Sequence, residues 1–563
     1  MFAMIYALSL ACTPSPEPQT APGTTSELRE TIERLRADQG SLSRFYNIDA
    51  SPKRRESLRQ LYQAARKELD KLDHNRLSFD GAMDAALLRN HLDKNLAQFD
   101  IQQRQFDEIK DLVPFADRII ALEEARRQME PLEPKKAADE LHALTRELQE
   151  LKKKVDGGLK AERHLADRAV ATTGRLREHL KSWNTFYTGY DPLFTWWARE
   201  PYKALDKALE EYAAALREKV VGAKVDDKLA IVGNPIGREA LMASLRYELI
   251  PYTPEELMKI GERELEWCRV EARKAARELG FGDDWRKALE HVKNLHVGPG
   301  EQPKLVRELA LEAIEYLEKN ELVTIPPLAK STWRMEMMSA EAQKVNPFFL
   351  GGEQIIVAYP TDEMPHDLKL MSLRGNNRHF SRATVQHELI PGHHLQGFMT
   401  NRYKPYRELF RTPFWTEGWA LYWEMLLWDL GFASTPEDRM GMLFWRMHRC
   451  VRILFSLGFH LGKLTPEECI EMLVNEVGHE RSTAEGEVRR SFGGAYDPLY
   501  QAAYMVGGLQ FRSLHRELVG SGKMTNRQFH DAILREGNIP VAAVRLILTR
   551  TRPPREFAND WRF

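Results

Sequence analysis

The sequence predicts a mainly α-helical protein with a small β-sheet. Three observations predict this fold class. Charged patterns of helical period dominate residues 26–220, and three later helix starts share nearly the same four-residue sequence. One stretch has the composition of a β-strand. The chain of 563 residues is long enough to bury a large core. Its formal net charge of -1 argues against a general electrostatic attraction to nucleic acid, so no nucleic-acid partner is expected.

Residues 1–24 differ from everything after them. MFAMIYALSLAC is uncharged and apolar over about the length of a signal-peptide core, and a Pro-, Ser- and Thr-rich tether follows. Ala11 before Cys12 resembles the cleavage box of bacterial lipoproteins, although Ser9 stands where leucine is usual and no basic residue precedes the apolar run. We expect an exported protein of the cell envelope or periplasm, attached to the membrane only through a lipid at Cys12. The alternative is an uncleaved end on a cytoplasmic protein.

Residues 25–220 are expected to form an N-terminal half of packed antiparallel helices. Leu141, Leu144, Leu148 and Leu151 repeat at a 3-4-3 spacing, which places them on one face of a helix. The charged runs between such positions are typical of solvated helix faces. This half is interpreted either as a lid over a cleft or as a scaffold.

Residues 221–563 are expected to form the half that carries the chemistry. Threonine, proline and two acidic residues recur at 253–256, 435–438 and 465–468, where threonine can cap a helix and proline suits its first turn. The strand candidate is GGEQIIVAYP, residues 351–360, about 30 residues before a histidine-rich motif. A small sheet is therefore expected near that motif.

The motif reads QHELIPGHHLQ and begins like the HExxH helix of a zinc hydrolase. Positions i and i+4 of a helix share a face and are ~6 Å apart, so two imidazoles there can meet one metal ion. Pro391 occupies the i+4 position after His387 and cannot bind a metal. Because Pro391 removes a backbone donor and Gly392 relaxes the chain, we expect a local bulge that brings His393 to the i+4 position. His394 remains an alternative ligand.

A third ligand is available on a later apolar helix. Within FWTEGWALYWEMLLWDLGF, residues 414–432, Glu417 would be costly to bury among aromatic residues without a cation. Glu424 lies two turns further on the same face and could orient a histidine from outside the ligand shell. In a zinc hydrolase of this kind, a base beside the metal takes a proton from water.

The sequence also offers groups that could contact a substrate. Tyr504 is a candidate donor to the oxyanion that forms on the attacked carbonyl. An exopeptidase must also bind a terminal charge, which arginines just before the motif could receive. The substrate-binding candidates are Tyr359, Arg374, Arg378, Arg382 and Arg512.

Three motifs together carry a family resemblance. HELIPGHHLQ, EGWALYWE and PLYQAAYMVGG are similar to the bacterial family named domain of unknown function 885, whose pattern is HExxPGHHxQ, EGWALYxE and a later Pro-x-x-x-x-x-Tyr-x-x-Gly. The upstream stretch IGREALMASLRYELIPYTPEELMKIGERELEWC is similar too. The likeness covers most of the chain after the tether.

The resemblance implies a fold and a mechanism. The family is considered akin to thermostable metallocarboxypeptidases and to angiotensin-converting enzyme, which are helical peptidases with a deep cleft between two halves. Carried over to this sequence, it implies one Zn²⁺ held by three ligands, a general base and an oxyanion donor. The ligands would be His387, His393 and Glu417, the base Glu388 and the donor Tyr504.

The expected function is zinc-dependent hydrolysis of amide bonds in short peptides, by an exopeptidase of carboxypeptidase or dipeptidase type. Two alternatives remain open at this point. One is a zinc amidase that acts on N-acyl amino acids or cell-wall fragments. The other is an envelope protein that binds peptides without cleaving them.

Overall fold

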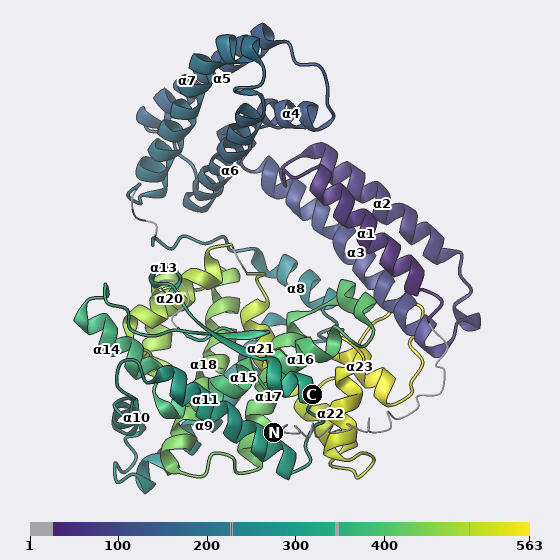
Figure 1. Ribbon diagram of the computed structural model, residues 1–563, viewed down its shortest axis with the longest axis vertical. Helices are drawn as coiled ribbons and strands as arrows, with labels where there is room; N and C mark the ends of the chain where they lie inside the picture. The colour runs from purple at the N-terminus through teal and green to yellow at the C-terminus, as the bar shows by residue number, and fades with distance from the viewer. Residues whose placement is uncertain (1–25, 226, 228, 344–347, 495) are drawn as a thin grey trace, which may run out of the picture.

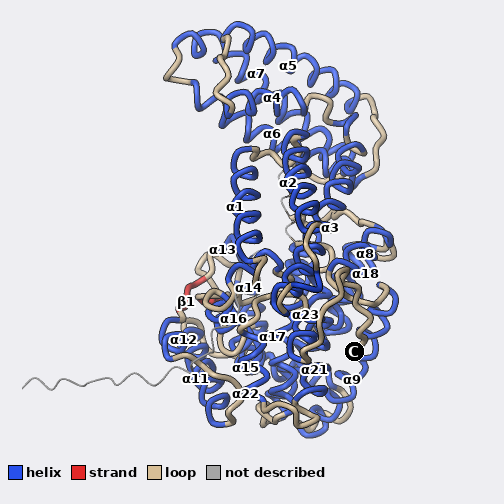
Figure 2. Tube along the Cα trace, turned by 90° about the vertical axis from the view of Figure 1, so that its right-hand side faces the viewer, coloured by secondary structure: helices blue, strands red, loops and turns tan. Residues whose placement is uncertain are grey.

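A computed structural model describes residues 26–225, 227, 229–343, 348–494 and 496–563. The predicted signal segment and Cys12 lie outside these residues. The described chain is almost entirely helical, with one two-stranded sheet, which confirms the mainly α fold class (Figure 1, Figure 2). Among the described helices, none has the length and apolar character needed to cross a bilayer.

The N-terminal helices stand on the rest of the molecule as an elongated arm. In Figures 1 and 2, α1 to α3 rise from the body and α4 to α7 form the far end. As predicted, α5 buries Leu141, Leu144 and Leu148. The elements of the arm are α1 (Arg29–Phe45), α2 (Pro52–Asp70), η1 (His74–Arg76), α3 (Phe79–Asp107), η2 (Lys110–Leu112), α4 (Ala116–Arg127), α5 (Pro134–Asp156), α6 (Arg163–Tyr187), α7 (Pro192–Leu216) and η3 (Arg217–Val221).

The body contains the remaining elements. Its first part comprises α8 (Gly237–Tyr247), α9 (Pro254–Glu278), α10 (Trp285–Lys293), α11 (Gln302–Lys319), α12 (Pro327–Thr332), β1 (Arg334–Met337), α13 (Ala340–Gln343), β2 (Gln354–Val357), α14 (His366–Gly375), α15 (Arg378–Glu388) and α16 (His393–Thr400). The second part comprises η4 (Pro405–Phe410), α17 (Pro413–Asp429), α18 (Pro436–His460), α19 (Pro466–Met472), η5 (Leu473–Val477), α20 (Arg481–Phe492), α21 (Tyr500–Leu518), α22 (Asn526–Leu534) and α23 (Val541–Leu548).

The arm and the body contain two large apolar cores. One core runs through the body and continues into α1 to α3, while a second lies within α4 to α7 and the segments that flank them. The second core has its last buried residue at Leu216, before the expected boundary at residue 220. The helices α1 to α3, which precede that boundary, share the core of the body.

The predicted helix starts are confirmed. Helices α9, α18 and α19 begin at Pro254, Pro436 and Pro466, and the threonine before each proline accepts a hydrogen bond from a backbone N–H of the first turn. A proline at the first position costs nothing there because its missing N–H would have no partner inside the helix.

The small sheet supports the histidine-rich motif. Strand β2 lies within the predicted range 351–360, and it pairs in parallel with β1, in the register Met335 with Ile355. Ile355 and Val357 belong to the same apolar cluster as Val385 of α15 and Leu389 just beyond its end. The sheet therefore packs against the helix that carries His387, as expected from the sequence.

Candidate metal centre

The motif QHELIPGHH forms two helices rather than one bulged helix. Helix α15 ends at Glu388 and α16 begins at His393, so the break is larger than the predicted bulge. The backbone of Gly392 comes so close to the carbonyl oxygen of His387 that a Cβ atom there would collide with it. Pro391 cannot donate to a helical carbonyl, and glycine alone fits the next position, which together explain the break.

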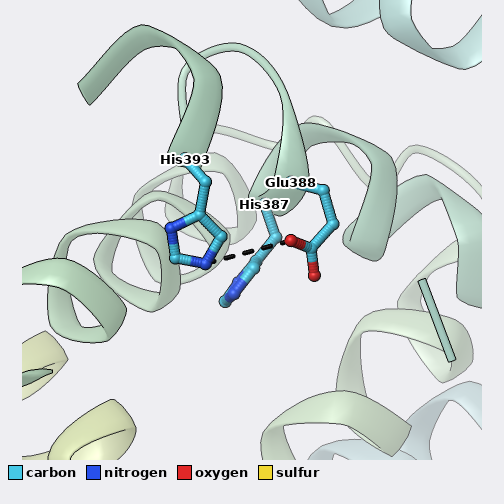
Figure 3. A group of neighbouring side chains, drawn as sticks. All are labelled: His387, Glu388 and His393. Carbon is cyan, nitrogen blue, oxygen red and sulfur yellow. Dashed lines mark ion pairs between the residues drawn. The ribbon is translucent and has the colours of Figure 1, made fainter. Parts of the chain in front are cut away.

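The break turns His393 back toward His387. Their ring centres are 4.9 Å apart, and Figure 3 shows the two side chains and Glu388 pointing toward a common space. Oε2 of Glu417 lies 3.6 Å from Nε2 of His387 and 3.3 Å from Nε2 of His393. Ligands on a tetrahedral zinc ion with bonds of ~2.0–2.1 Å are separated by ~3.3 Å, so these three atoms have a suitable spacing.

Glu388 lies next to the same histidines. Its Oε2 is 3.9 Å from Nε2 of His393, further than Glu417 is from either ring. Ligand atoms of His387, Glu388 and His393 all lie within 4.8 Å of one another, so Glu388 is still close enough to act at the same centre. Gly351 packs against the carboxylate of Glu388, where a Cβ atom would collide with it. Burial raises the pKa of Glu388, and the imidazoles of His387 and His393 act in the opposite direction.

Outer partners fix each of the three converging side chains. Nδ1 of His387 lies 2.7 Å from Oε1 of Glu424, which is the position predicted for Glu424. The side-chain amide of Gln396 lies 2.8 Å from Nδ1 of His393, and the hydroxyl of Tyr500 donates to Oε1 of Glu417. Such partners orient metal ligands and set which ring nitrogen stays free. In contrast, Nε2 of His394 lies 2.8 Å from the carbonyl oxygen of Ala329, so His394 does not join the set.

The electrostatics of the set favour a cation. Burial alone would raise the pKa of Glu417, but the imidazoles of His393 and His387 hold it well below its usual range. Burial would lower the pKa of His387, yet Glu417 and Glu424 raise it to about 9. Oε2 of Glu417 is buried and has no hydrogen-bond partner in the described part of the chain. Two imidazoles and a carboxylate with an unpartnered oxygen match the donor sets of zinc hydrolases, so the residues fit a zinc ion.

A close contact between two helices places the tyrosines. A Cβ atom on Gly418 of α17 would lie 2.6 Å from the backbone of Gly507 of α21, so glycine allows the helices to touch. This contact sets Tyr500 against Glu417 and stacks the ring of Tyr504 on His387, with ring centres 6.1 Å apart. The hydroxyl of Tyr504 makes no hydrogen bond to any residue within the described ranges, and Tyr504 lines the same cavity as His387, His393 and Glu417.

The cavity has a volume of about 510 Å³. It is lined by the residues predicted for the chemistry, namely His387, Glu388, His393, Glu417 and Tyr504. The residues predicted to bind substrate lie outside its lining, and these are Tyr359, Arg374, Arg378, Arg382 and Arg512. The structure thus brings the first group together and not the second.

Ion pairs explain why the predicted arginines are elsewhere. Arg374 bonds to Glu290 and Glu480, Arg382 forms a two-pronged pair with Glu312, and Arg512 pairs with Asp429. Arg378 is half exposed, 4.0 Å from Glu308. Each guanidinium is therefore directed to a carboxylate away from the cavity. The backbone N–H of Tyr359 is bonded to Gln343, at the end of β2.

The cavity residues that the sequence did not predict include Arg449, Arg452, Arg490 and Tyr500. Arg449 and Arg452 lie in α18, whose residues are buried along nearly its whole length. Arginine is almost never buried without a partner or a role, so two arginines three positions apart in such an apolar stretch were the available signal. Nothing in their sequence spacing links them to His387.

Comparisons with known proteins agree on the family and the fold. A family model described as bacterial protein of unknown function, DUF885, matches residues 46–547. No curated protein matches the chain. A solved structure from Shewanella oneidensis, described as a candidate lipoprotein of unknown function, superposes with a TM-score of 0.68 at 18% identity, covering 93% of this chain and 100% of that chain. Another, from Colwellia psychrerythraea and also described as a candidate lipoprotein, gives a TM-score of 0.59 at 17% identity, covering 93% and 98%. At these identities the likeness shows the fold alone.

Proposed function

The chain belongs to the DUF885 family of bacterial proteins of unknown function, and from its site we propose that it is a zinc-dependent exopeptidase of short peptides. One observation carries the proposal. Two imidazole nitrogens and the carboxylate oxygen of Glu417 converge at 3.3 and 3.6 Å, while the carboxylate of Glu388 lies beside them, 3.9 Å from His393. This arrangement is typical of a hydrolytic metal site with a separate general base.

The ligands would be His387, His393 and Glu417. When bound, a zinc ion supplies Lewis acidity that polarises a carbonyl group and makes water more acidic. Glu424 holds the ring of His387, and Tyr500 holds the carboxylate of Glu417. These outer contacts keep the ligands in place before any substrate arrives.

Glu388 would move the proton. Its carboxylate accepts a proton from the attacking water and then donates it to the nitrogen of the leaving amine, so the carboxylate is restored in each cycle. Tyr504 would donate its hydroxyl hydrogen bond to the oxyanion that forms on the attacked carbonyl. Its unpartnered hydroxyl and its place beside His387 support this role.

The cavity supports a small substrate. A volume of about 510 Å³ lies within the range of pockets that hold small ligands, and it suits a short peptide better than a folded protein. We propose that the helical arm and the body form a peptidase-like fold, in which a peptide end reaches the ligands. Hydrolysis of a terminal amide bond would follow.

The cell envelope is the proposed location. The two similar structures are described as candidate lipoproteins, which agrees with the lipoprotein-like segment around Cys12. Attachment through a lipid at Cys12 would leave the helical domain free in the periplasm. Labelling with a radioactive fatty acid tests this: incorporation is expected in the parent and not in Cys12→Ser.

The catalytic proposal is tested by metal content and turnover together. The purified parent and Glu388→Gln are each expected to hold close to one zinc per chain, and only the parent is expected to cleave a peptide library. Glu308→Gln, which changes an exposed carboxylate outside the cavity lining, serves as the matched control and should cleave like the parent. Cleavage by Glu388→Gln at the parental rate would show that Glu388 is not the base.

Substrate class is tested by a parallel screen. N-acyl amino acids and cell-wall fragments are offered beside dipeptides and tripeptides, because an amidase would use the same metal set with a different pocket. Preferential cleavage of acylated amino acids would replace the peptidase assignment. Peptide binding with neither metal nor turnover would replace it with a binding protein.

A further inference from the structure

Three arginines from two helices face the cavity beside the metal ligands. Arg449 and Arg452 come from α18, and Arg490 comes from α20. Their side chains are 5%, 2% and 9% exposed. Burying three guanidinium groups at one place is costly unless opposite charges match them.

The protein matches these charges only in part. Glu487 accepts from Nε of Arg452 at 2.7 Å and lies 3.4 Å from Nε of Arg490. Arg449 is 3.6 Å from Glu424, but Glu424 also holds His387. Only two carboxylates of the described chain therefore lie within ion-pair distance of the three guanidinium groups, and one of them also contacts His387.

Unused donors show the same imbalance. Nε of Arg449 and Nη1 of Arg452 are buried and have no hydrogen-bond partner among the described residues. The pKa of the Arg449 guanidinium is lowered, first by burial and then by the positive charge of Arg452. A planar guanidinium with free N–H groups is suited to bind a carboxylate through paired hydrogen bonds.

The group lies at a useful distance from the ligands. The guanidinium carbons of Arg449 and Arg452 are 4.6 and 4.3 Å from the ring centre of Tyr504, which is itself 6.1 Å from the ring centre of His387. An extended peptide spans at most ~3.6 Å per residue. No more than two or three residues would separate a cleaved bond from a group held by these arginines.

We propose that Arg449, Arg452 and Arg490 bind the C-terminal carboxylate of the substrate. This inference rests on the proposed peptidase function and makes it more specific. It assigns cleavage to the carboxyl end, with release of a short C-terminal fragment, and it excludes an aminopeptidase. The same chemistry could come from an acidic side chain, so the test separates the two sources.

The test measures binding without turnover. Glu388→Gln, loaded with zinc, is titrated in a calorimeter with Ala-Ala-Ala, with its C-terminal amide, and with Ala-Ala-Glu amide, which carries a carboxylate on a side chain only. The free acid is expected to bind about tenfold more tightly than either amide, the size of one lost charge-assisted contact. Adding Arg452→Gln or Arg449→Met should reduce this preference to less than about threefold.

Two further variants serve as controls for the charge of Arg449 and for the loss of an arginine outside the cavity. Arg449→Lys keeps a positive charge and should retain part of the preference, whereas Arg512→Gln changes a surface arginine and should retain all of it. Circular dichroism of each variant checks that the fold is intact. Equal binding of the acid and the Ala-Ala-Ala amide would overturn the proposal, and so would equal binding of the acid and the Glu amide.

Failure of this inference and failure of the proposed function look different. If the parent cleaves free acids and amides at the same rate, the peptidase function stands and the carboxylate site falls. If the parent cleaves nothing but still prefers the free acid, the carboxylate site stands and the peptidase function falls.

Discussion

Among the buried arginines of the molecule, two groups differ in how opposite charges match them. Arg407 of η4 is fully buried and bonds to Asp84 of α3 at 2.7 Å and to Glu536 after α22. Asp84 also accepts the hydroxyl of Tyr406 at 2.8 Å. This group, called the Arg407 network below, joins the arm to the body with more negative than positive charge around it.

The arginines of the cavity are the opposite case. Arg449, Arg452 and Arg490, called the cavity arginines below, outnumber the two carboxylates that lie within ion-pair distance of them in the described chain, Glu424 and Glu487. A buried charge is usually matched because an unmatched one destabilises the folded state. An imbalance kept beside a candidate metal centre therefore indicates a role in binding, whereas the matched network indicates a role in stability.

The largest expected effect on stability is in the Arg407 network. Arg407→Met removes the buried cation that bonds to both Asp84 and Glu536, with Lys404 still paired to Glu536, and should lower the free energy of unfolding by about 3–5 kcal/mol. Urea denaturation followed by circular dichroism measures the change. Arg512→Met removes a surface pair with Asp429 and should cost less than about 1 kcal/mol. Similar losses in the two variants would contradict the difference between buried and exposed pairs.

A zinc ion bound beside the cavity should stabilise the folded protein by an amount comparable to the loss in Arg407→Met. Zinc at a hundred times its dissociation constant should raise the free energy of unfolding by about 2.7 kcal/mol, because it binds the folded state only. Thermal denaturation with and without zinc measures the gain. His393→Ala should abolish it, and His394→Ala, the neighbouring control that faces Ala329, should keep it. A gain that survives in His393→Ala would place the zinc elsewhere.

Acid should weaken the region around the cavity arginines. Burial lowers the pKa of His479 to about 3, and the nearby cations Arg452 and Arg449 act in the same direction. An unfolded histidine takes up a proton below pH ~6.5, so the unfolded state binds more protons between that pH and about 3. This contribution to stability is complete above pH ~6.5 and is lost as the pH falls, by ~1.4 kcal/mol for each unit.

Denaturation at pH 7.5 and pH 5.0 measures this slope. His479→Gln removes one of the titrating groups and should reduce the difference between the two pH values by about 2 kcal/mol. An unchanged difference in the variant would show that His479 takes up its proton equally in the folded and unfolded chain.

The smallest expected effect on stability is at the cavity arginines. Arg449→Met replaces a poorly compensated charge by an apolar side chain that can still pack on Tyr504, so the free energy of unfolding should change by less than about 1 kcal/mol. The same urea experiment applies. A loss as large as that of Arg407→Met would mean that the cavity arginines are structural, and the contrast between the two groups would disappear.

Much of the fold follows from local patterns in the sequence. The leucines of α5 and the Thr-Pro starts of α9, α18 and α19 were predicted because their physical causes, side-chain period and capping, act within a few residues. The strand was placed correctly, but its partner β1 was not predicted, since four half-exposed residues carry little periodic signal.

The candidate metal set was predicted from motifs and one resemblance. His387, His393 and Glu417 do converge, and Glu424 stands behind His387 as expected. The arginines predicted to bind substrate, three of which precede His387 closely in the chain, lie outside the cavity lining. Neighbouring side chains along α14 and α15 point in different directions. Arg374 pairs with Glu480 and Arg382 pairs with Glu312, both outside the cavity lining.

The sequence by itself determined where helices begin, which faces of them are buried, and which residue types could hold a metal ion. Tertiary structure alone decided how far the backbone turns at Gly392, how closely Gly418 approaches Gly507, and which arginines reach the cavity. The physical reason is the distance along the chain over which each effect acts. Capping and periodicity act over a few residues, whereas the environment of Arg449 or Arg452 depends on helices far apart in the chain.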